Sequence, residues 1–160
     1  MSGWRWLPLA ALVVAADQAS KAWIERHFQL YESVTLLPVL DITRLHNPGA
    51  AFSFLAGAGG WQRWLFTGLA IAVSVAIVVW LRGVHARAQA WLACGLALIL
   101  GGALGNVIDR LRHGFVIDFV HVHWQDSWFP AFNVADAAIT IGALCLIVDA
   151  LVESRRTKLP

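Results

Sequence analysis

The sequence predicts an all-α membrane protein with four transmembrane helices and a small β-structure outside the membrane. Of its 160 residues, 59% are hydrophobic and 14% are charged, whereas soluble domains have roughly 25% charged residues. The mean hydropathy is +0.65. Seven of the nine tryptophans lie near the ends of apolar runs, as in the aromatic belts at membrane interfaces. We therefore expect one integral membrane domain over residues 1–160.

Four apolar segments are long enough to cross a bilayer, which takes about 20 residues. They cover approximately residues 4–24, 64–81, 90–108 and 132–152. The second and third carry no charge, whereas the first contains Asp17 and Lys21. We interpret the first segment as a retained helix and not a signal peptide, because no small-x-small cleavage site precedes a soluble domain.

The segment between the first two spans, about residues 25–60, is too long for a tight turn. It contains two β-prone stretches, 33–37 and 39–45, which are separated by Pro38. This pattern predicts a small strand-based structure on the outer surface of the membrane.

Four spans place both termini on the same side of the membrane. The basic residues divide equally between the two sides, six on each. Their density in the short flanks, around Arg5, Arg82 and Arg87, favours cytoplasmic termini. Asp118 and Asp136 then face the extracytoplasmic side.

Composition also argues against several classes of function. The net charge of +2 and the dispersed basic residues do not indicate nucleic-acid binding. Cys94 and Cys145 lie inside apolar runs, where we expect buried thiols and no disulfide. Ser20 and Lys21 are adjacent, so on a helix they point about 100° apart, which is poor geometry for a serine–lysine protease dyad.

Two histidines, His121 and His123, alternate on an extended segment and point to one face. With Asp118 or Asp126 they offer a possible metal site. A single H-x-H pattern is weak evidence, because interfacial histidines are common, and we expect no metal and no cofactor.

The most informative acids are Asp118 and Asp136, which flank a short aromatic loop. A carboxylate in or beside a membrane is costly, and two facing carboxylates tend to share one proton, which suits acid–base chemistry. Asp136 also has a simpler explanation, since a helix N-terminus stabilises an anion. The residues alone leave both interpretations open.

Three further groups of residues lie around these acids. Asp17 and Lys21 are four apart and share a helix face, which predicts an ion pair. Gly101 and Gly105 form a small-xxx-small face for close helix packing. The last group supplies residues near the outer interface. Asn47 and Gly49 lie in a turn, and Asn133 lies three residues before Asp136. Asn106, Asp109 and Arg110 share one helix face, with Asp109 and Arg110 as a possible pair.

Five motifs together resemble the lipoprotein signal peptidase family, also called signal peptidase II, over roughly residues 10–150. They lie, in order, at residues 17–21 (DQASK), 47–52 (NPGAAF), 101–110 (GGALGNVIDR), 116–119 (VIDF) and 129–136 (FPAFNVAD). Each motif is weak alone, whereas five in this order on four spans are specific.

The resemblance implies an aspartyl endopeptidase of the bacterial cytoplasmic membrane, with a short outer helix lying on the membrane. Its substrates would be diacylglyceryl-modified prolipoproteins, cut just before the lipidated cysteine. Asp118 and Asp136 would be the catalytic dyad. Residues that would bind substrate or support the site are Asn47, Gly49, Asn106, Asp109, Arg110, Asn133 and Ala135, with Asp17 and Lys21 in a more structural role.

The expected mechanism needs no metal and no covalent intermediate. One aspartate activates a water and its protonated partner assists the scissile carbonyl, although the sequence does not assign the two roles. We expect a monomer that contacts prolipoproteins and membrane lipids. The alternative is a small proton- or ion-coupled transporter, which predicts acids near mid-membrane, and here they cluster at one interface. A structural subunit without activity is a third reading.

Overall fold

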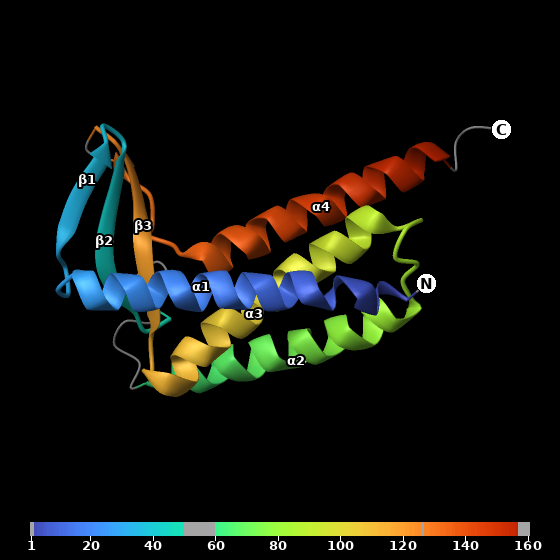
Figure 1. The fold of residues 1–160 in the computed structure, drawn as a ribbon, viewed down its shortest axis with the longest axis horizontal. Helices are drawn as coiled ribbons and strands as arrows, with labels where there is room; N and C mark the ends of the chain where they lie inside the picture. The colour runs from blue at the N-terminus through green and yellow to red at the C-terminus, as the bar shows by residue number, and fades with distance from the viewer. Residues whose placement is uncertain (1, 50–59, 126, 157–160) are drawn as a thin grey trace.

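Four long helices lie side by side, and an antiparallel sheet lies across one end of them (Figure 1). The computed structural model describes residues 2–49, 60–125 and 127–156. The helical elements are η1 (Gly3–Trp6), α1 (Leu7–His27), α2 (Trp61–Gly83), α3 (Ala90–Arg112) and α4 (Val134–Arg156). The strands are β1 (Ser33–Leu37), β2 (Leu40–Asn47), β3 (Val116–Trp124) and β4 (Ser127–Trp128).

Three of the helices are long and apolar enough to cross a membrane. These are α2, α3 and the Val134–Arg155 part of α4, with mean hydropathies of 2.3, 1.9 and 2.0. Helix α1 is not among them, because Asp17, Gln18 and Lys21 lower its mean hydropathy. Three of the four predicted spans are thus helices of sufficient length and hydropathy to cross a membrane.

The predicted outer β-structure is present, but it is larger than the sequence indicated. Its four strands run in the order β1-β2-β3-β4, and β3 and β4 come from the segment between α3 and α4. The β-prone stretches near 33–37 and 39–45 form the hairpin β1–β2. Residues 50–59 of the expected outer segment lie outside the described residues, and the described parts contain no short helix at the sheet end.

Helix α3 packs against α1, α2 and α4, and glycines make the close contacts possible. A Cβ on Gly101 would lie 2.7 Å from the carbonyl oxygen of Ala10 in α1, and one on Gly102 would overlap the carbonyl of Ala135 in α4. A Cβ on Gly105 would lie 2.6 Å from an Asp17 carboxylate oxygen. The predicted face of Gly101 and Gly105 therefore packs closely on α1, and Gly102, which was not predicted, provides the close contact with α4.

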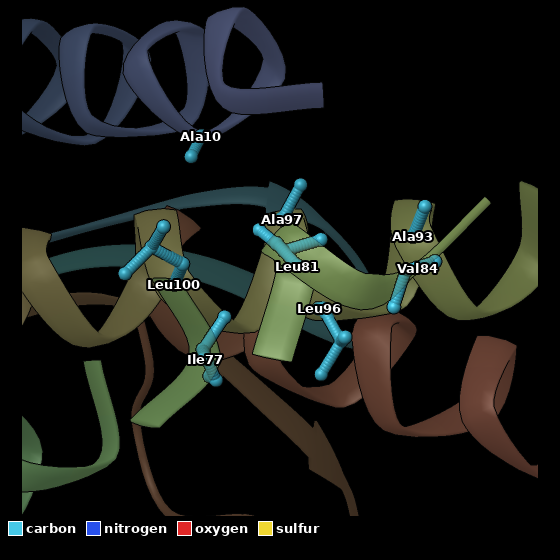
Figure 2. Packing of buried hydrophobic residues seen from close by; sticks show 8 residues of the cluster. All are labelled: Ala10, Ile77, Leu81, Val84, Ala93, Leu96, Ala97 and Leu100. Atoms are coloured by element: carbon cyan, nitrogen blue, oxygen red, sulfur yellow. The ribbon is translucent and has the colours of Figure 1, made fainter. Parts of the chain in front are cut away.

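Two apolar clusters hold the bundle and connect it to the sheet. The larger one, in Figure 2, joins α1, α2, α3 and the α2–α3 connection through Ala10, Ile77, Leu81, Val84, Ala93, Leu96, Ala97 and Leu100. The smaller one joins α1 to β3 through Ile24, Ile117 and Phe119. The second cluster fixes the start of β3, which carries Asp118, against the end of α1.

We predict that Gly102→Ala destabilises the protein, because the added methyl group forces α3 and α4 apart. The expected loss is about 1–3 kcal/mol, as for overpacking in a core, measured by thermal unfolding in detergent. Gly68→Ala is the matched control, since a Cβ at Gly68 in α2 meets nothing within 4 Å. It should be neutral or stabilising by up to ~1 kcal/mol, and equal effects of the two changes would contradict the packing argument.

Candidate active site

Asp118 and Asp136 meet where the sheet covers the bundle, because two local features bring β3 and α4 together. Gly114, in the left-handed conformation with φ of 88°, ends α3 and lets the chain turn directly into β3. The residues before α4 then pair back on β3, with Phe132 and Val120 exchanging backbone hydrogen bonds of 3.0 and 2.8 Å. Asp118 in β3 therefore lies beside the first turn of α4.

Asn133 caps α4 and contacts both aspartates. Its Oδ1 accepts from the Asp136 N–H at 3.0 Å, and its own N–H donates to Asp136 Oδ2 at 3.3 Å, which is a reciprocal helix cap. The other end of the same amide, Nδ2, donates to Asp118 Oδ1 at 2.7 Å. Since Asn133 is fully buried, it links the two carboxylates rigidly.

On its other oxygen, each carboxylate accepts a hydrogen bond from the side-chain amide of a second asparagine. Asn47, at the end of β2, donates from Nδ2 to Asp118 Oδ2 at 3.0 Å. Asn106, in α3, donates from Nδ2 to Asp136 Oδ1 at 2.8 Å. The interpretation of Asp136 as a helix-start carboxylate is thus correct but incomplete, because the same group also belongs to a polar cluster with Asp118.

The electrostatic surroundings of Asp118 favour its protonated form. Its exposed fraction is 3%, and burial raises the pKa of its carboxyl group to about 7, with a further contribution from the charge of Asp136. The hydrogen bonds from Asn47 and Asn133 lower the pKa and offset part of this effect. A carboxyl group with this pKa exchanges a proton near neutral pH, as acid–base chemistry requires.

Gly49 and Arg110 both lie next to the Phe66 ring. The Asn47 side chain accepts from the Gly49 N–H at 2.9 Å, and a Cβ on Gly49 would come within 2.9 Å of the ring. The Arg110 guanidinium carbon is 5.7 Å from the ring centroid, and Nη1 donates to the Asn106 carbonyl at 3.4 Å. Phe66 is a neighbour of the site that no motif in the sequence predicted.

Lys21 lies between two buried carboxylates below the dyad. Its ammonium is 2.8 Å from Asp17 Oδ2 and 2.8 Å from Asp109 Oδ2. The predicted Asp17–Lys21 pair is confirmed. The predicted pairing of Asp109 with Arg110 is wrong, because neighbouring residues on a helix point apart and Asp109 faces α1 instead.

The same carboxylates also bind the backbone of the elements that carry the dyad. Asp17 Oδ1 accepts from the Ala135 N–H in the first turn of α4 at 3.0 Å, and Asp109 Oδ2 accepts from the Ile117 N–H in β3 at 3.1 Å. Gln18 adds a bond from Nε2 to Asp109 Oδ1 at 2.8 Å. Ala135 therefore contributes its backbone to this network, and Gln18, in the same motif as Asp17, was not predicted to take part.

The two histidines lie further along β3 and do not reach the dyad in any contact of the described residues. The rings of His121 and His123 pack on Trp128 at centroid distances of 4.6 and 4.4 Å. His123 Nε2 is 3.6 Å from Asp41 Oδ1. Within the described ranges, no group of three or more His, Cys, Asp or Glu side chains is arranged to hold a metal; Asp126 lies outside those ranges.

An apolar groove of about 390 Å³ opens beside Asp136. It is lined by Phe129, Phe132, Asp136, Ala137, Thr140 and Ile141. The groove joins the loop before α4 to the outer face of that helix, and Asp136 is its single charged lining residue among those described. Such a groove can accommodate an apolar group next to the Asp136 carboxylate.

Comparisons with known proteins agree with this geometry. Residues 9–152 match the family described as signal peptidase (SPase) II. A lipoprotein signal peptidase of Shewanella halifaxensis is 52% identical over 98% of this chain and 92% of its own length. The corresponding protein of Shewanella amazonensis is 53% identical over 92% of this chain and 88% of its own length.

Solved structures show the same fold. A chain described as a bacterial membrane enzyme, determined by the in meso method at 2.3 Å resolution, superposes with a TM-score of 0.82. It is 31% identical, and the match covers 97% of this chain and 92% of that one. A second chain with the same description, at 1.9 Å resolution, gives a TM-score of 0.79 at 32% identity over 92% of both chains.

We predict that Asp118→Asn stabilises the protein, and more so as the pH rises. Folding raises the pKa of Asp118 from 3.8 to about 7, so its ionised form opposes folding, with the full cost above pH 7 and none below the unfolded pKa. At 1.36 kcal/mol per pKa unit, this cost is at most ~4 kcal/mol. Thermal unfolding at pH 5 and pH 8 tests the prediction, and a stability gain that does not grow with pH would contradict it.

Proposed function

The chain belongs to the signal peptidase II family, and from this we propose that it is a membrane aspartyl endopeptidase with Asp118 and Asp136 as its catalytic dyad. Its substrates are lipid-modified prolipoproteins, from which it removes the signal peptide by cutting before the diacylglyceryl-modified cysteine. The observation that carries the assignment is that Asn133 donates hydrogen bonds to both carboxylates. Its Nδ2 donates to Asp118 Oδ1 at 2.7 Å, and its backbone N–H donates to Asp136 Oδ2 at 3.3 Å.

The two aspartates have different roles in this proposal. Asp118 holds the shared proton, because burial raises its pKa to about 7. Asp136 is the ionised base, because it sits at the N-terminus of α4 and accepts hydrogen bonds from Asn106 and Asn133, both of which favour a negative charge.

Peptide cleavage then follows from one water placed between the carboxylates. Asp136 takes a proton from the water while the water oxygen attacks the scissile carbonyl carbon. Asp118 donates its proton to the carbonyl oxygen as negative charge develops there. The tetrahedral intermediate collapses when the carbon–nitrogen bond breaks. The proton on Asp136 passes to the leaving nitrogen, and the new carboxyl product returns a proton to the dyad.

The groove beside Asp136 is a suitable place for the lipid part of the substrate. Its lining is apolar apart from Asp136 and Thr140, and it continues onto the exposed apolar side chains of α4, Ile141, Leu144 and Ile147. An acyl chain in this groove stays in an apolar environment while the peptide reaches the carboxylates. The site is bordered on its other side by Asn47 and Gly49, at and just after the end of β2, and by Arg110 in α3. These residues would contact the peptide.

We further propose that all four long helices span the cytoplasmic membrane, with cytoplasmic termini and an extracytoplasmic dyad. The start of η1, the C-terminal end of α4 and the α2–α3 connection lie at the end of the bundle opposite the sheet (Figure 1), and the basic flanks around Arg5, Arg82 and Arg87 are at that end. Helix α1 becomes compatible with lipid because Asp17 and Lys21 are buried inside the bundle.

The dyad and all of its described donors come from one chain, which supports a monomer surrounded by membrane lipids. The short outer helix remains a prediction of the family resemblance. A proton-coupled transporter, the alternative function, has no support among the relatives, which are named as lipoprotein signal peptidases.

We predict that Asp118→Asn and Asp136→Asn each abolish cleavage of a lipidated precursor, with a loss of at least ~10³-fold. Each change removes one carboxylate from a proton-sharing pair but keeps the side-chain volume. The measurement is conversion of a purified diacylglyceryl-modified precursor by the reconstituted protein, alongside thermal unfolding to confirm folding. Near-normal cleavage by either folded variant would rule out the dyad.

We predict that Ile141→Trp raises KM by about tenfold with a small change in kcat. The larger ring fills the groove and removes ground-state binding of the acyl chain, at a cost of ~1.4 kcal/mol. Leu69→Trp is the matched control, because Leu69 is also exposed, but on α2, and does not line the groove. Equal KM values for the two variants would place the lipid elsewhere.

A further inference from the structure

We propose that Lys21 is a positioning residue for the reaction, because it fixes which end of the Asn106 side chain faces Asp136. The inference rests on the proposed function and concerns the same dyad. It gives the buried Asp17–Lys21–Asp109 network a role in chemistry in addition to its role in folding.

The argument begins with the two ends of the Asn106 amide. One end is an acceptor and the other a donor, and they have nearly the same size, so the neighbours decide the orientation. Lys21 Nζ lies 3.1 Å from Asn106 Oδ1, and an ammonium group only donates hydrogen bonds. The carbonyl end of Asn106 must therefore face Lys21.

The NH2 end of Asn106 is then left for the dyad. It donates to Asp136 Oδ1 at 2.8 Å. In the flipped orientation, the NH2 group would face the ammonium and the carbonyl oxygen would face the carboxylate, which are two repulsive contacts in a buried site. Without Lys21, two described contacts still oppose the flip: the bond to Asp136 itself, at 2.8 Å, and the weaker bond from Asn133 Nδ2 to Asn106 Oδ1, at 3.3 Å. The strong donor on the carbonyl end is lost.

Asn133 needs no such external group, because its orientation is set by the backbone. The Asp136 N–H also only donates, and it binds Asn133 Oδ1 at 3.0 Å, which directs Nδ2 toward Asp118. Each aspartate thus faces an amide NH2 oriented by a donor-only group: the α4 backbone for Asn133 and the Lys21 ammonium for Asn106.

The ion pairs of Lys21 keep its ammonium in place. Asp17 and Asp109 each lie 2.8 Å from Nζ, and the Lys21 side chain is 2% exposed. The contact to Asn106 is a separate hydrogen bond from these ion pairs, so structural and positioning roles make different predictions.

A double-mutant cycle between Lys21 and Asn106 tests the proposal. Lys21→Met alone leaves two unpaired buried carboxylates and risks misfolding, so the cycle is built in an Asp109→Asn background. In that background, Lys21→Met leaves the Asp17 carboxylate and no ammonium. The net charge is then the same as that of Asp17, Lys21 and Asp109 together in the natural protein. Cleavage of a lipidated precursor by reconstituted protein gives kcat and KM, and thermal unfolding gives the folded fraction.

We expect Lys21→Met to lower kcat of the Asp109→Asn protein by about 10²-fold, as for loss of one oriented donor at an active site, with KM changed less than about threefold. In the Asn106→Ala, Asp109→Asn protein, the same change should lower kcat by less than about threefold, because the group on which Lys21 acts is already absent. Equal losses in both backgrounds, or a loss that follows the folded fraction, would overturn the proposal.

Two references keep the interpretation clear. Arg44→Met removes a cation that is 3.4 Å from Glu25 and makes no contact with the dyad, so it should lower stability without changing kcat. If the natural protein cleaves the precursor, but Lys21→Met lowers kcat by the same factor with and without Asn106, only the positioning role fails. If the natural protein does not cleave it, the proposed function itself fails.

Discussion

Lys21 and its two carboxylates, Asp17 and Asp109, hold together every element that carries the dyad. The ammonium joins α1 to α3, and the remaining carboxylate oxygens accept backbone hydrogen bonds from Ala135 in α4 and Ile117 in β3. A charge inside a bilayer is costly unless it is paired and fully hydrogen-bonded. This requirement allows few alternative arrangements of the four elements, so the network defines their relative positions.

The close approach of the helices is the second condition for this network. Glycines on both faces of α3 let α1 and α4 come near enough for their polar groups to share one interior, and Gly105 leaves the space that an Asp17 oxygen occupies. Packing in lipid depends on such small residues, because apolar side chains gain little by leaving an apolar solvent. Glycine packing and charge pairing therefore support each other.

The electrostatic surroundings of the dyad differ from those of this network. Asp118 is buried and has amide donors but no ion pair among the described residues, so its pKa rises to about 7. The acids below it are paired with a lysine. In the proposed function, one set of carboxylates thus serves the structure and another serves proton transfer, at some cost in stability.

The sequence by itself determined the membrane class, three apolar spans, the hairpin of the outer sheet, the Asp17–Lys21 pair and the two candidate catalytic acids, because these depend on local hydropathy and on spacing along one helix. Only the tertiary structure decided that Asp109 pairs with Lys21 and not Arg110, that β3 extends the sheet, and that Asn133 joins Asp118 to Asp136. These contacts link residues far apart in the chain. The glycine pattern of α3 predicts close packing, but it does not determine which helix packs there, and that choice sets which polar groups meet.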